Sequence, residues 1–339
     1  MSEAAIEPHL VDIGIPTLGR THFLMQALET VLGQTESRWR VTISANDVGG
    51  DAVAEALAPY LIDPRIEYSP TGGNIGQAPN HTRLLQRATA PYFAILHDDD
   101  RWKPRFLERR VAFLEGHPAA GFVFSPAISI DGDGHELKRF DPDLPQGEHE
   151  PAVVLPKLLV ANIVGVPSNA LLRTSAVREV GNAFDDRFFY WDWEQWMRLA
   201  VRFPVGYVHC WDSAVRVHDS QMTFTHWPDR DDILRLLDHF EQLVHTYQPG
   251  LQFDPKPLAR KRAAVLLSAA LDSVERGDRR RALGYARRAQ AVYPRSALNT
   301  KTLALLASLP LGRRGRSALK KLRYRILRNS IRVHLRSRD

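Results

Sequence analysis

Sulfur is scarce in this sequence, and long apolar runs are missing. Cys210 is the single cysteine among 339 residues, which excludes a disulfide within the chain and is typical of a reducing compartment. Apolar stretches such as residues 263–271 are too short to span a bilayer. The first residues contain no basic segment followed by an apolar one, so the sequence predicts no secretory signal. We therefore expect a cytoplasmic protein.

Acidic residues are rare in the last quarter of the chain. Of the 45 Lys+Arg and 39 Asp+Glu, 23 and 4 lie in residues 256–339, which leaves 22 and 35 for residues 1–255. The net charge of +6 therefore combines a body of −13 with a tail of +19. This asymmetry predicts two units with different partners.

Strands and amphipathic helices are predicted to alternate over the first 125 residues. Apolar runs indicate the strands, and apolar side chains at helical spacing indicate the helices between them. The strands are expected at 11–16, 39–47, 65–70 and 92–100, and the helices at 21–35, 51–61 and 77–89. This order predicts an α/β fold with a doubly wound, mostly parallel sheet. Ligands bind outside the carboxyl ends of such strands, so the loops after Ile15, Ser44, Tyr68 and Leu96 should form the site.

The rest of the chain predicts a hairpin and then mostly helices. The sequence "DGDG" at 131–134 lies between apolar runs and favours a hairpin over a calcium loop, because the other ligands of such a loop are missing. Residues 188–203 predict an amphipathic helix with an aromatic and acidic start. Residues 259–296 predict two helices around a "GD" turn, similar to a tetratricopeptide-like hairpin. We expect a domain of residues 1–252 followed by a small all-helical domain of residues 253–339.

Three consecutive carboxylates, Asp98, Asp99 and Asp100, follow the fourth predicted strand. Neighbouring carboxylates repel, and the end of a buried strand is a costly place for unpaired charge. One explanation is a helix N-terminus, where Asp is favoured as a cap and beside the helix dipole. The other is a divalent cation, Mn²⁺ or Mg²⁺, bound by carboxylate oxygens and by the phosphates of a substrate. The three residues alone do not decide between the two.

Four longer motifs occur in a fixed order around these carboxylates. They are "IGIPTLGRTHFLMQALETVLGQT", "TGGNIGQAPNHTRLLQRATAPYFAILHDDDRWKPRFL", "GVPSNALLRTSAV" and "FDDRFFYWDWEQWMRLA". Together they closely resemble the large family-two glycosyltransferases, which have the GT-A fold. The resemblance covers about residues 9–225, and it favours the cation over the helix cap.

The resemblance implies a nucleotide site at the carboxyl edge of the sheet. The implied nucleotide-binding residues are Pro16, Thr17, Arg20, Asp47, Asn74, Gly76, Asn80, Asp98 and Asp99, with Asp98 on the ribose. One departure concerns the acidic pair that normally ends the second strand. Ala45 or Asn46 stands in place of the first acid and leaves Asp47, which weakens the assignment of the base as uracil.

A metal site is implied as well. Asp100 is the main expected ligand, and Asp98 and His218 are the further ones, with Mn²⁺ or Mg²⁺ as the cofactor. A single histidine such as His218 is equally compatible with a structural role.

The stretch "YWDWEQW" supplies carboxylates for the chemistry. Transfer of a sugar to a hydroxyl requires a base that takes the acceptor proton, and the resemblance implies Asp192 in this role, with Glu194 as the second candidate. Trp191 stands where the family has an acid, and apolar neighbours should raise the pKa of Asp192. Trp191, Trp193 and Ser168 are implied on the sugar or acceptor side. The alternative is that both acids only favour a helix start.

These features predict an inverting, metal-dependent, hexosyltransferase-type enzyme with a nucleoside-diphosphate sugar, in the first place a UDP-sugar, as donor. The expected acceptor is a hydroxyl, lipid-linked or on a glycan, in the synthesis of a bacterial polysaccharide, glycolipid or glycoconjugate. The alternatives are a nucleotidyltransferase and a non-catalytic nucleotide-sugar or glycan-binding module on a degenerate glycosyltransferase fold. The basic tail predicts either a solvated helical face or peripheral contact with the anionic inner face of a membrane, and its few aromatics disfavour nucleic acid.

Overall fold

The computed structural model describes residues 9–46, 51–218 and 229–298. The chain forms two compact units, one of residues 1–158 with 162–221 and one of residues 159–161 with 222–339. Helix α9 (Arg230–Tyr247) thus belongs to the second unit, whereas the sequence placed the boundary after residue 252.

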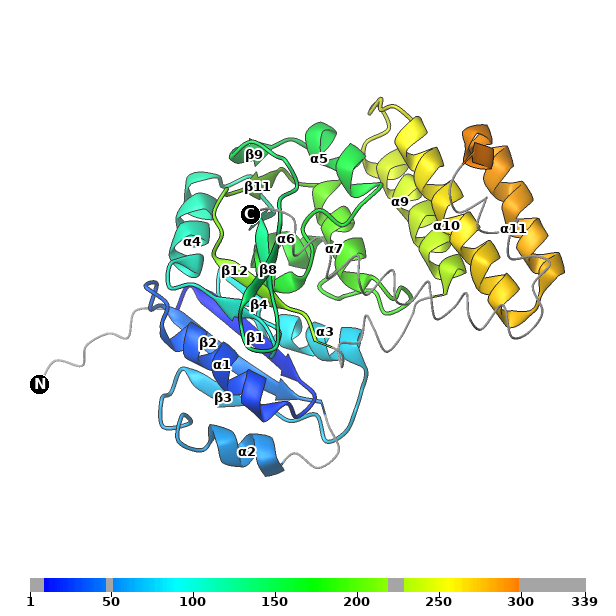
Figure 1. Ribbon diagram of the computed structural model, residues 1–339. Helices are drawn as coiled ribbons and strands as arrows, with labels where there is room; N and C mark the ends of the chain where they lie inside the picture. The colour runs from blue at the N-terminus through cyan, green and yellow to red at the C-terminus, as the bar shows by residue number, and fades with distance from the viewer. Residues whose placement is uncertain (1–8, 47–50, 219–228, 299–339) are drawn as a thin grey trace, which may run out of the picture. The chain divides into compact units, whose positions relative to one another are not determined.

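An eight-stranded sheet forms the centre of the first unit, with the strand order β3-β2-β1-β4-β10-β6-β11-β9. Figure 1 shows its neighbouring strands β3, β2, β1 and β4. Its strands are β1 (Val11–Thr17), β2 (Trp39–Ala45), β3 (Ile66–Tyr68), β4 (Tyr92–Ile95), β6 (Phe122–Phe124), β9 (Gly147–His149), β10 (Ala170–Arg173) and β11 (Val205–Tyr207). Strands β3, β2, β1 and β4 are parallel neighbours, as are β6 and β11. Strand β10 runs antiparallel to β4 and β6, and β9 antiparallel to β11. This mixed, mostly parallel sheet confirms the predicted α/β fold.

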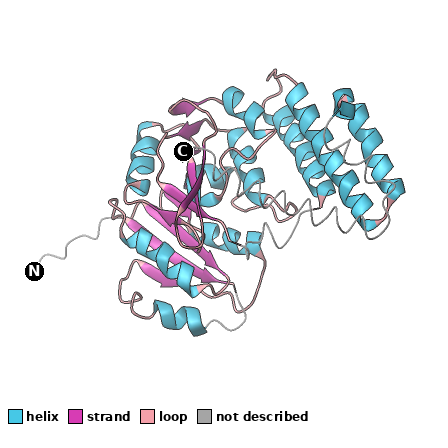
Figure 2. Ribbon diagram, viewed as in Figure 1, coloured by secondary structure: helices cyan, strands magenta, loops and turns pink. Residues whose placement is uncertain are grey.

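Figure 2 shows the helices that connect these strands. Those described in the first unit are α1 (Thr21–Leu32), α2 (Asp51–Leu57), α3 (Gln77–Arg87), α4 (Phe106–Gly116), α5 (Pro151–Leu158), α6 (Thr174–Glu179) and α7 (Trp191–Ala200), with a 3₁₀ turn at Pro167–Asn169. Helix α3 packs directly on β1, because a Cβ atom at Gly14 would lie 3.0 Å from side-chain atoms of Leu84. The first turn of α3 is thereby held at the carboxyl edge of β1 and β2, where Ser44 Oγ donates a hydrogen bond to Asn80 Oδ1.

A second, four-stranded sheet has the order β5-β12-β7-β8. Its strands are β5 (Arg101–Trp102), β12 (Ser213–Arg216), β7 (Ala127–Ile130) and β8 (Glu136–Phe140). Strands β7 and β8 form the predicted hairpin, whose turn is closed by Asp131 Oδ1, which accepts hydrogen bonds from the backbone N–H groups of Asp133 and His135.

Strand β5 corrects one interpretation of the acidic run. Residues 98–100 lie in the turn between β4 and β5, and helix α4 begins only at Phe106. The helix-cap explanation of Asp98, Asp99 and Asp100 is therefore wrong. The short strand forms because Arg101 and Trp102 pair with Ala214 and Ser213 of β12, far along the chain.

A buried ion pair joins α4 to the start of β12. Arg110 Nη2 lies 3.0 Å from Asp212 Oδ1, and the exposed fractions of the two side chains are 0% and 1%. Arg109 Nη1 adds a second contact at 3.2 Å to Asp212 Oδ2. This ion pair connects α4, which covers the large sheet, to the start of β12, a strand of the second sheet.

We expect Asp212→Ala to destabilise the protein by about 3–5 kcal/mol, because the guanidinium of Arg110 would stay buried without its counterion. Urea unfolding measures this loss. The matched control is Glu108→Ala, which removes an exposed partner of Arg105 and should leave the free energy of unfolding almost unchanged. Equal effects of the two variants would contradict the assigned role of Asp212.

Three helices make up most of the described part of the second unit, namely α9, α10 (Lys256–Arg276) and α11 (Arg279–Val292), followed by a 3₁₀ turn at Pro294–Leu298. Gly277, with φ of 88°, ends α10, and Asp278 Oδ1 accepts from Arg281 N, so that α11 starts at once. This arrangement confirms the predicted helical hairpin.

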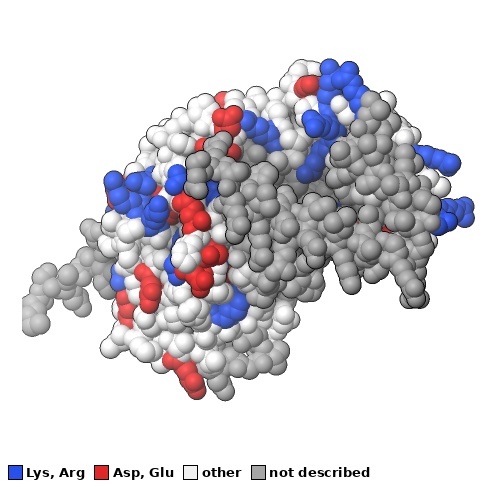
Figure 3. All heavy atoms as spheres, in the orientation of Figure 1, with Lys and Arg blue, Asp and Glu red and all other residues white. Residues whose placement is uncertain are grey.

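Lys and Arg predominate among the charged side chains of this unit that are left uncovered in Figure 3. A membrane-spanning helix needs about 20 mostly apolar residues, and none of the helices in the described ranges meets this requirement.

Candidate active site

The acidic turn after β4 is buried. Asp98, Asp99 and Asp100 are 1%, 6% and 2% exposed, so each carboxylate needs compensating contacts. The three carboxylates make these compensating contacts with different parts of the first unit, so the hydrogen-bond partners of each one differ.

Asp98 faces the carboxyl end of β1. Thr17 Oγ1 donates a hydrogen bond of 2.6 Å to Asp98 Oδ2, and Arg20, just before α1, donates to both oxygens through Nε and Nη2. Burial raises the pKa of Asp98, and the charge of Arg20 opposes that shift. Two of the predicted nucleotide-side residues, Thr17 and Arg20, thus both contact a third, Asp98.

Asp99 contacts the guanidinium of Arg20 and the imidazole of His218. His218 Nε2 lies 2.9 Å from Asp99 Oδ2, and Arg20 Nη1 lies 3.1 Å from the same oxygen. Burial alone would raise the pKa of Asp99, but the hydrogen bond of His218 and the charge of Arg20 together lower it. His218 therefore contacts the acidic turn through Asp99.

Asp100 has no cationic side chain in hydrogen-bond contact within the described residues. Ser168 Oγ donates 2.6 Å to Asp100 Oδ2, and the backbone N–H of Arg216 donates 2.9 Å to Oδ1. Burial, with the nearby charge of Asp99, raises the pKa of Asp100 well above its ordinary value. Ser168, expected on the sugar side, here orients a carboxylate.

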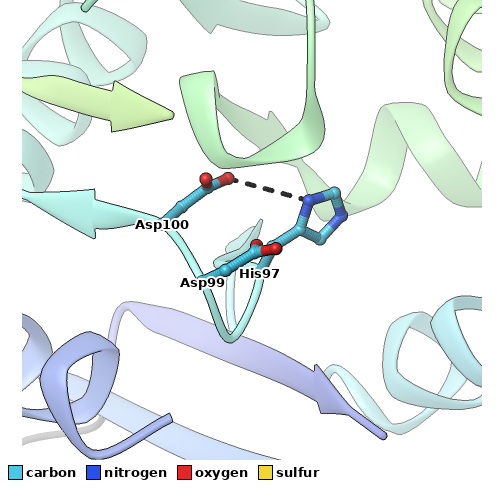
Figure 4. Close-up of side chains that lie close together, drawn as sticks. All are labelled: His97, Asp99 and Asp100. Carbon is cyan, nitrogen blue, oxygen red and sulfur yellow. Dashed lines mark ion pairs between the residues drawn. The ribbon is translucent and has the colours of Figure 1, made fainter. Parts of the chain in front are cut away.

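The donor set of this turn fits a divalent cation. His97, Asp99 and Asp100 each place one ligand atom within 4.8 Å of the others, and His97 Nδ1 lies 3.7 Å from Asp100 Oδ2 (Figure 4). Two carboxylates and one imidazole can bind Mn²⁺ or Mg²⁺ and remove the excess negative charge. Asp100 is the one predicted ligand in this group. Asp98 contacts Arg20, and His218 contacts Arg20 and Asp99. Metal ligation by Asp98 and by His218 stays a prediction.

The carboxyl end of β2 carries an asparagine network where the sequence lacked an acid. Asn46 Nδ2 donates to Gly76 O at 3.0 Å and to Asn74 Oδ1 at 3.3 Å, and Asn46 Oδ1 accepts from Ile75 N at 2.8 Å. Asn46 therefore holds the loop that contains Asn74 and Gly76 against β2. Asp47 lies outside the described residues. Pro16, in β1, pairs with Ser44 of β2 beside this loop.

Asp192 lies in the first turn of α7 and is half-buried. Its Oδ2 accepts a hydrogen bond of 3.2 Å from Asn162 Nδ2, and its Oδ1 accepts from Trp193 N at 2.7 Å. Burial raises the pKa of Asp192 to about 6, and these hydrogen bonds oppose the shift. A carboxylate with this pKa is suited to accept a proton near neutral pH.

The other residues of the aromatic segment pack inward. Glu194 is buried and lies 3.0 Å from Arg198 Nη2 within the same helix. Trp193 donates through Nε1 to Leu158 O at 2.8 Å, and Trp191 donates to Gln77 Oε1 at 3.3 Å. Their exposed fractions of 4% and 6% leave little ring surface, and their contact with a sugar stays a prediction.

Two histidines at this site escaped the sequence analysis, His97 and His81. His81 is 2% exposed and lies in α3, and its Nε2 is 3.2 Å from His97 Nε2. The ring of His81 also lies 4.4 Å from that of Trp191, between centroids. His81 thus connects the acidic turn to the residue that precedes Asp192.

The mixed, mostly parallel sheet of the first unit resembles the GT-A fold. Residues 12–181, half of the chain, match the model of Glycosyl transferase family 2, and the chain belongs to that family.

Curated relatives match over shorter stretches. The chain is 30% identical over 132 residues to "Putative teichuronic acid biosynthesis glycosyltransferase TuaG" of Bacillus subtilis, a match that covers 39% of this chain and 52% of the relative. It is 23% identical over 155 residues to "Putative colanic acid biosynthesis glycosyl transferase WcaA" of Escherichia coli, which covers 46% and 56%. The chain thus spans about half the length of these relatives.

Solved structures share the fold at low identity. S. aureus TarS 1–349 in complex with UDP-GlcNAc superposes with a TM-score of 0.60 at 10% identity, over 84% of this chain and 92% of that one. The mannosyltransferase PcManGT from Pyrobaculum calidifontis, in complex with GDP-Man and Mn²⁺, has a TM-score of 0.50 at 17% identity, over 92% and 83%. At these identities the likeness shows the fold alone.

Proposed function

We propose that this glycosyltransferase is an inverting, metal-dependent enzyme that moves a hexose from a nucleoside-diphosphate sugar, in the first place a UDP-sugar, to a hydroxyl acceptor. The observation that carries the proposal is the pair of carboxylate environments in one unit. The turn brings ligand atoms of His97, Asp99 and Asp100 within 4.8 Å of one another, and burial raises the pKa of Asp192 to about 6. Such a transfer needs a Lewis acid for the leaving diphosphate and a base for the acceptor proton, which a cation in the turn and Asp192 would supply.

The acidic turn and the loop after β2 form the proposed donor side. His97, Asp99 and Asp100 would hold the cation, which when bound stabilises the charge of the departing nucleoside diphosphate. Arg20 provides a further positive charge beside Asp98 and Asp99. The complexes of TarS with UDP-GlcNAc and of PcManGT with GDP-Man support a nucleotide-sugar donor. Because Ala45 or Asn46 stands where the family has an acid at the end of β2, we expect the base preference to differ from that of relatives that have the acid.

Asp192 is the proposed general base. Its carboxylate takes the proton of the acceptor hydroxyl as that oxygen attacks the anomeric carbon from the face opposite the diphosphate, which inverts the configuration. Asn162 and the N–H of Trp193 fix the orientation of the carboxylate. The curated relatives named for teichuronic acid and colanic acid biosynthesis support a role in polysaccharide synthesis, and we propose a hydroxyl acceptor that is lipid-linked or on a glycan.

Product analysis with the full chain tests this function. Purified protein is incubated with Mn²⁺, a panel of UDP- and GDP-sugars and simple glycoside acceptors, and the products are resolved by NMR. We expect nucleoside diphosphate and a glycoside of inverted anomeric configuration. Release of pyrophosphate would indicate a nucleotidyltransferase instead, and nucleotide binding without any turnover would indicate a binding module.

A membrane contact through the basic C-terminal part belongs to the same proposal. Residues 279–338 contain no Asp or Glu, and α11 exposes Arg279, Arg280, Arg287 and Arg288. Each Lys or Arg near an anionic surface contributes about 1 kcal/mol. The predicted amphipathic tail itself lies outside the described residues.

We expect removal of residues 312–339 to weaken binding to phosphatidylglycerol vesicles while turnover of a water-soluble acceptor stays intact. Co-sedimentation with anionic and with neutral vesicles measures the change, and the neutral vesicles serve as the control. Unchanged sedimentation with anionic vesicles would exclude the tail as the contact.

A further inference from the structure

One histidine pair next to the acidic turn has a hydrogen-bond pattern that determines where its protons lie. His81 Nδ1 lies 2.8 Å from the backbone oxygen of Gln77, one helical turn earlier in α3. A carbonyl oxygen can only accept, so Nδ1 of His81 carries the hydrogen. His81 is 2% exposed, with Trp191 and Phe184 against its ring, surroundings that favour a neutral imidazole. Its Nε2 is therefore an acceptor.

The neighbouring imidazole must then be the donor. His97 Nε2 lies 3.2 Å from His81 Nε2, and two ring nitrogens at this distance need one hydrogen between them. Because His81 Nε2 has none, that hydrogen belongs to His97 Nε2. In a neutral imidazole the other nitrogen then has a free lone pair. This other nitrogen, Nδ1 of His97, is the one that faces Asp100 Oδ2, at 3.7 Å.

We propose that His97 is a metal ligand through Nδ1 and that His81 is the positioning residue that keeps this nitrogen free of a proton. The proposal rests on the metal dependence of the proposed function. A metal-bound histidine usually donates its second N–H to a carboxylate, a carbonyl or a water, which orients the ring and raises its basicity. Here a second histidine, itself oriented by Gln77 O, takes that place.

A nitrogen ligand has a consequence for the choice of metal. Mg²⁺ prefers oxygen ligands in near-ideal octahedral geometry, whereas imidazole is a better ligand for first-row transition metals. A site of one imidazole and the carboxylates of Asp99 and Asp100 should therefore bind Mn²⁺ in preference to Mg²⁺. Replacement of the imidazole by a carboxylate should reduce that preference.

The experiment is a titration of the full chain with MnCl₂ alone, followed by the EPR signal of free Mn²⁺. We expect His81→Phe to weaken Mn²⁺ binding by about 10–100-fold, the usual effect of losing an outer hydrogen-bond partner. His81→Gln, whose side-chain oxygen can accept from His97, should restore most of the affinity. His117→Phe is the matched control, because His117 Nδ1 also lies 2.8 Å from a carbonyl oxygen one turn earlier, that of Phe113, in α4.

A second measurement keeps the test decisive if a His81 variant fails to fold. Electron spin-echo modulation of bound Mn²⁺ detects a directly coordinated ¹⁴N nucleus. We expect this modulation in the unchanged chain and its loss in His97→Ala, with His97→Asp binding Mn²⁺ without it and with a smaller preference over Mg²⁺. Bound Mn²⁺ without nitrogen modulation in the unchanged chain would overturn the proposal, as would a His81→Phe affinity equal to that of His117→Phe.

Asp99→Asn separates this proposal from the proposed function. If Asp99→Asn abolishes Mn²⁺ binding while the His97 and His81 variants bind normally, the metal site stands and the histidine pair is structural. If the unchanged chain binds no Mn²⁺, the metal dependence of the proposed function fails as well.

Discussion

Asp192→Asn is expected to lower kcat by about 10²–10⁴-fold, the usual contribution of a general base. The amide keeps the size of the carboxylate and an oxygen that can accept from Trp193 N. Nucleotide binding should stay intact, because the acidic turn is unchanged. Steady-state kinetics with the donor identified by product analysis measures the loss, and Asp186→Asn, an exposed acid earlier in the same segment, is the control.

The pH profile assigns this loss to proton transfer. Asp192 works as a base only when ionised, so kcat/KM of the unchanged chain should rise with pH and reach half its plateau near pH 6. Asp192→Asn should lack this acid limb. If Glu194→Gln removed the limb and Asp192→Asn kept it, the base would be Glu194, the second candidate.

Stability should change in the opposite direction to activity. The folded protein raises the pKa of Asp192 from 3.8 to about 6, so the folded state binds its proton more tightly than the unfolded chain. Ionisation of Asp192 therefore costs stability as the pH rises through this window, and the cost is fully present at pH 7. We expect the Tm of Asp192→Asn at pH 7 to equal or exceed that of the unchanged chain, which excludes misfolding as the cause of the lost turnover.

The second large effect is expected for Asp100→Ala. The variant removes a carboxylate of the proposed metal group, and affinity for Mn²⁺ should fall by more than about 100-fold, since outer-shell partners alone are worth 10–100-fold. Thermal shifts with UDP, GDP, dTDP and CDP, each with Mn²⁺ and with EDTA, measure the result. We expect one nucleotide to stabilise the unchanged chain only with Mn²⁺, and none to stabilise the variant in this way.

Asp133→Ala is the control for that panel. Asp131, Asp133 and His135 form another group with ligand atoms within 4.8 Å, but it is exposed at the turn of a hairpin. Its loss should leave the metal-dependent shift unchanged. An unchanged shift in Asp100→Ala, or a lost one in Asp133→Ala, would contradict the assignment of the metal to the turn after β4.

Much of the fold could be predicted because its signals are local. Apolar runs and helical spacing located β1, α1, β2 and α3 within a few residues, and the "DG" turn located the β7–β8 hairpin, whereas β4 ends at Ile95 and not at residue 100 as expected. The acidic turn was interpreted in two ways, since both a cap and a cation explain three carboxylates. The helix cap is excluded by β5, whose pairing partner in β12 lies more than a hundred residues away, and the cation stays a prediction. No local pattern contains such a contact.

The contact partners of the three carboxylates could not be predicted from local sequence patterns either. Nothing in "HDDD" indicates that Arg20 contacts Asp98 and Asp99 while Ser168 and the backbone of Arg216 bind Asp100. His81 gave no signal, because histidine is intermediate in its preference for burial and a single one in a helix indicates no particular role. The available hint was its place one turn after Gln77, in a segment that the family resemblance already put at the nucleotide side.

The hydrogen bond from Arg216 N to Asp100 has a consequence for folding. It joins residues 116 apart in sequence, and the contact of His218 with Asp99 joins residues 119 apart. Pairing over such separations carries a large loop-closure entropy and forms late. A chain that has assembled only β1 to β4 therefore lacks the contacts that Arg216 and His218 make with Asp100 and Asp99. During refolding, the recovery of Mn²⁺ affinity should lag behind the recovery of secondary structure.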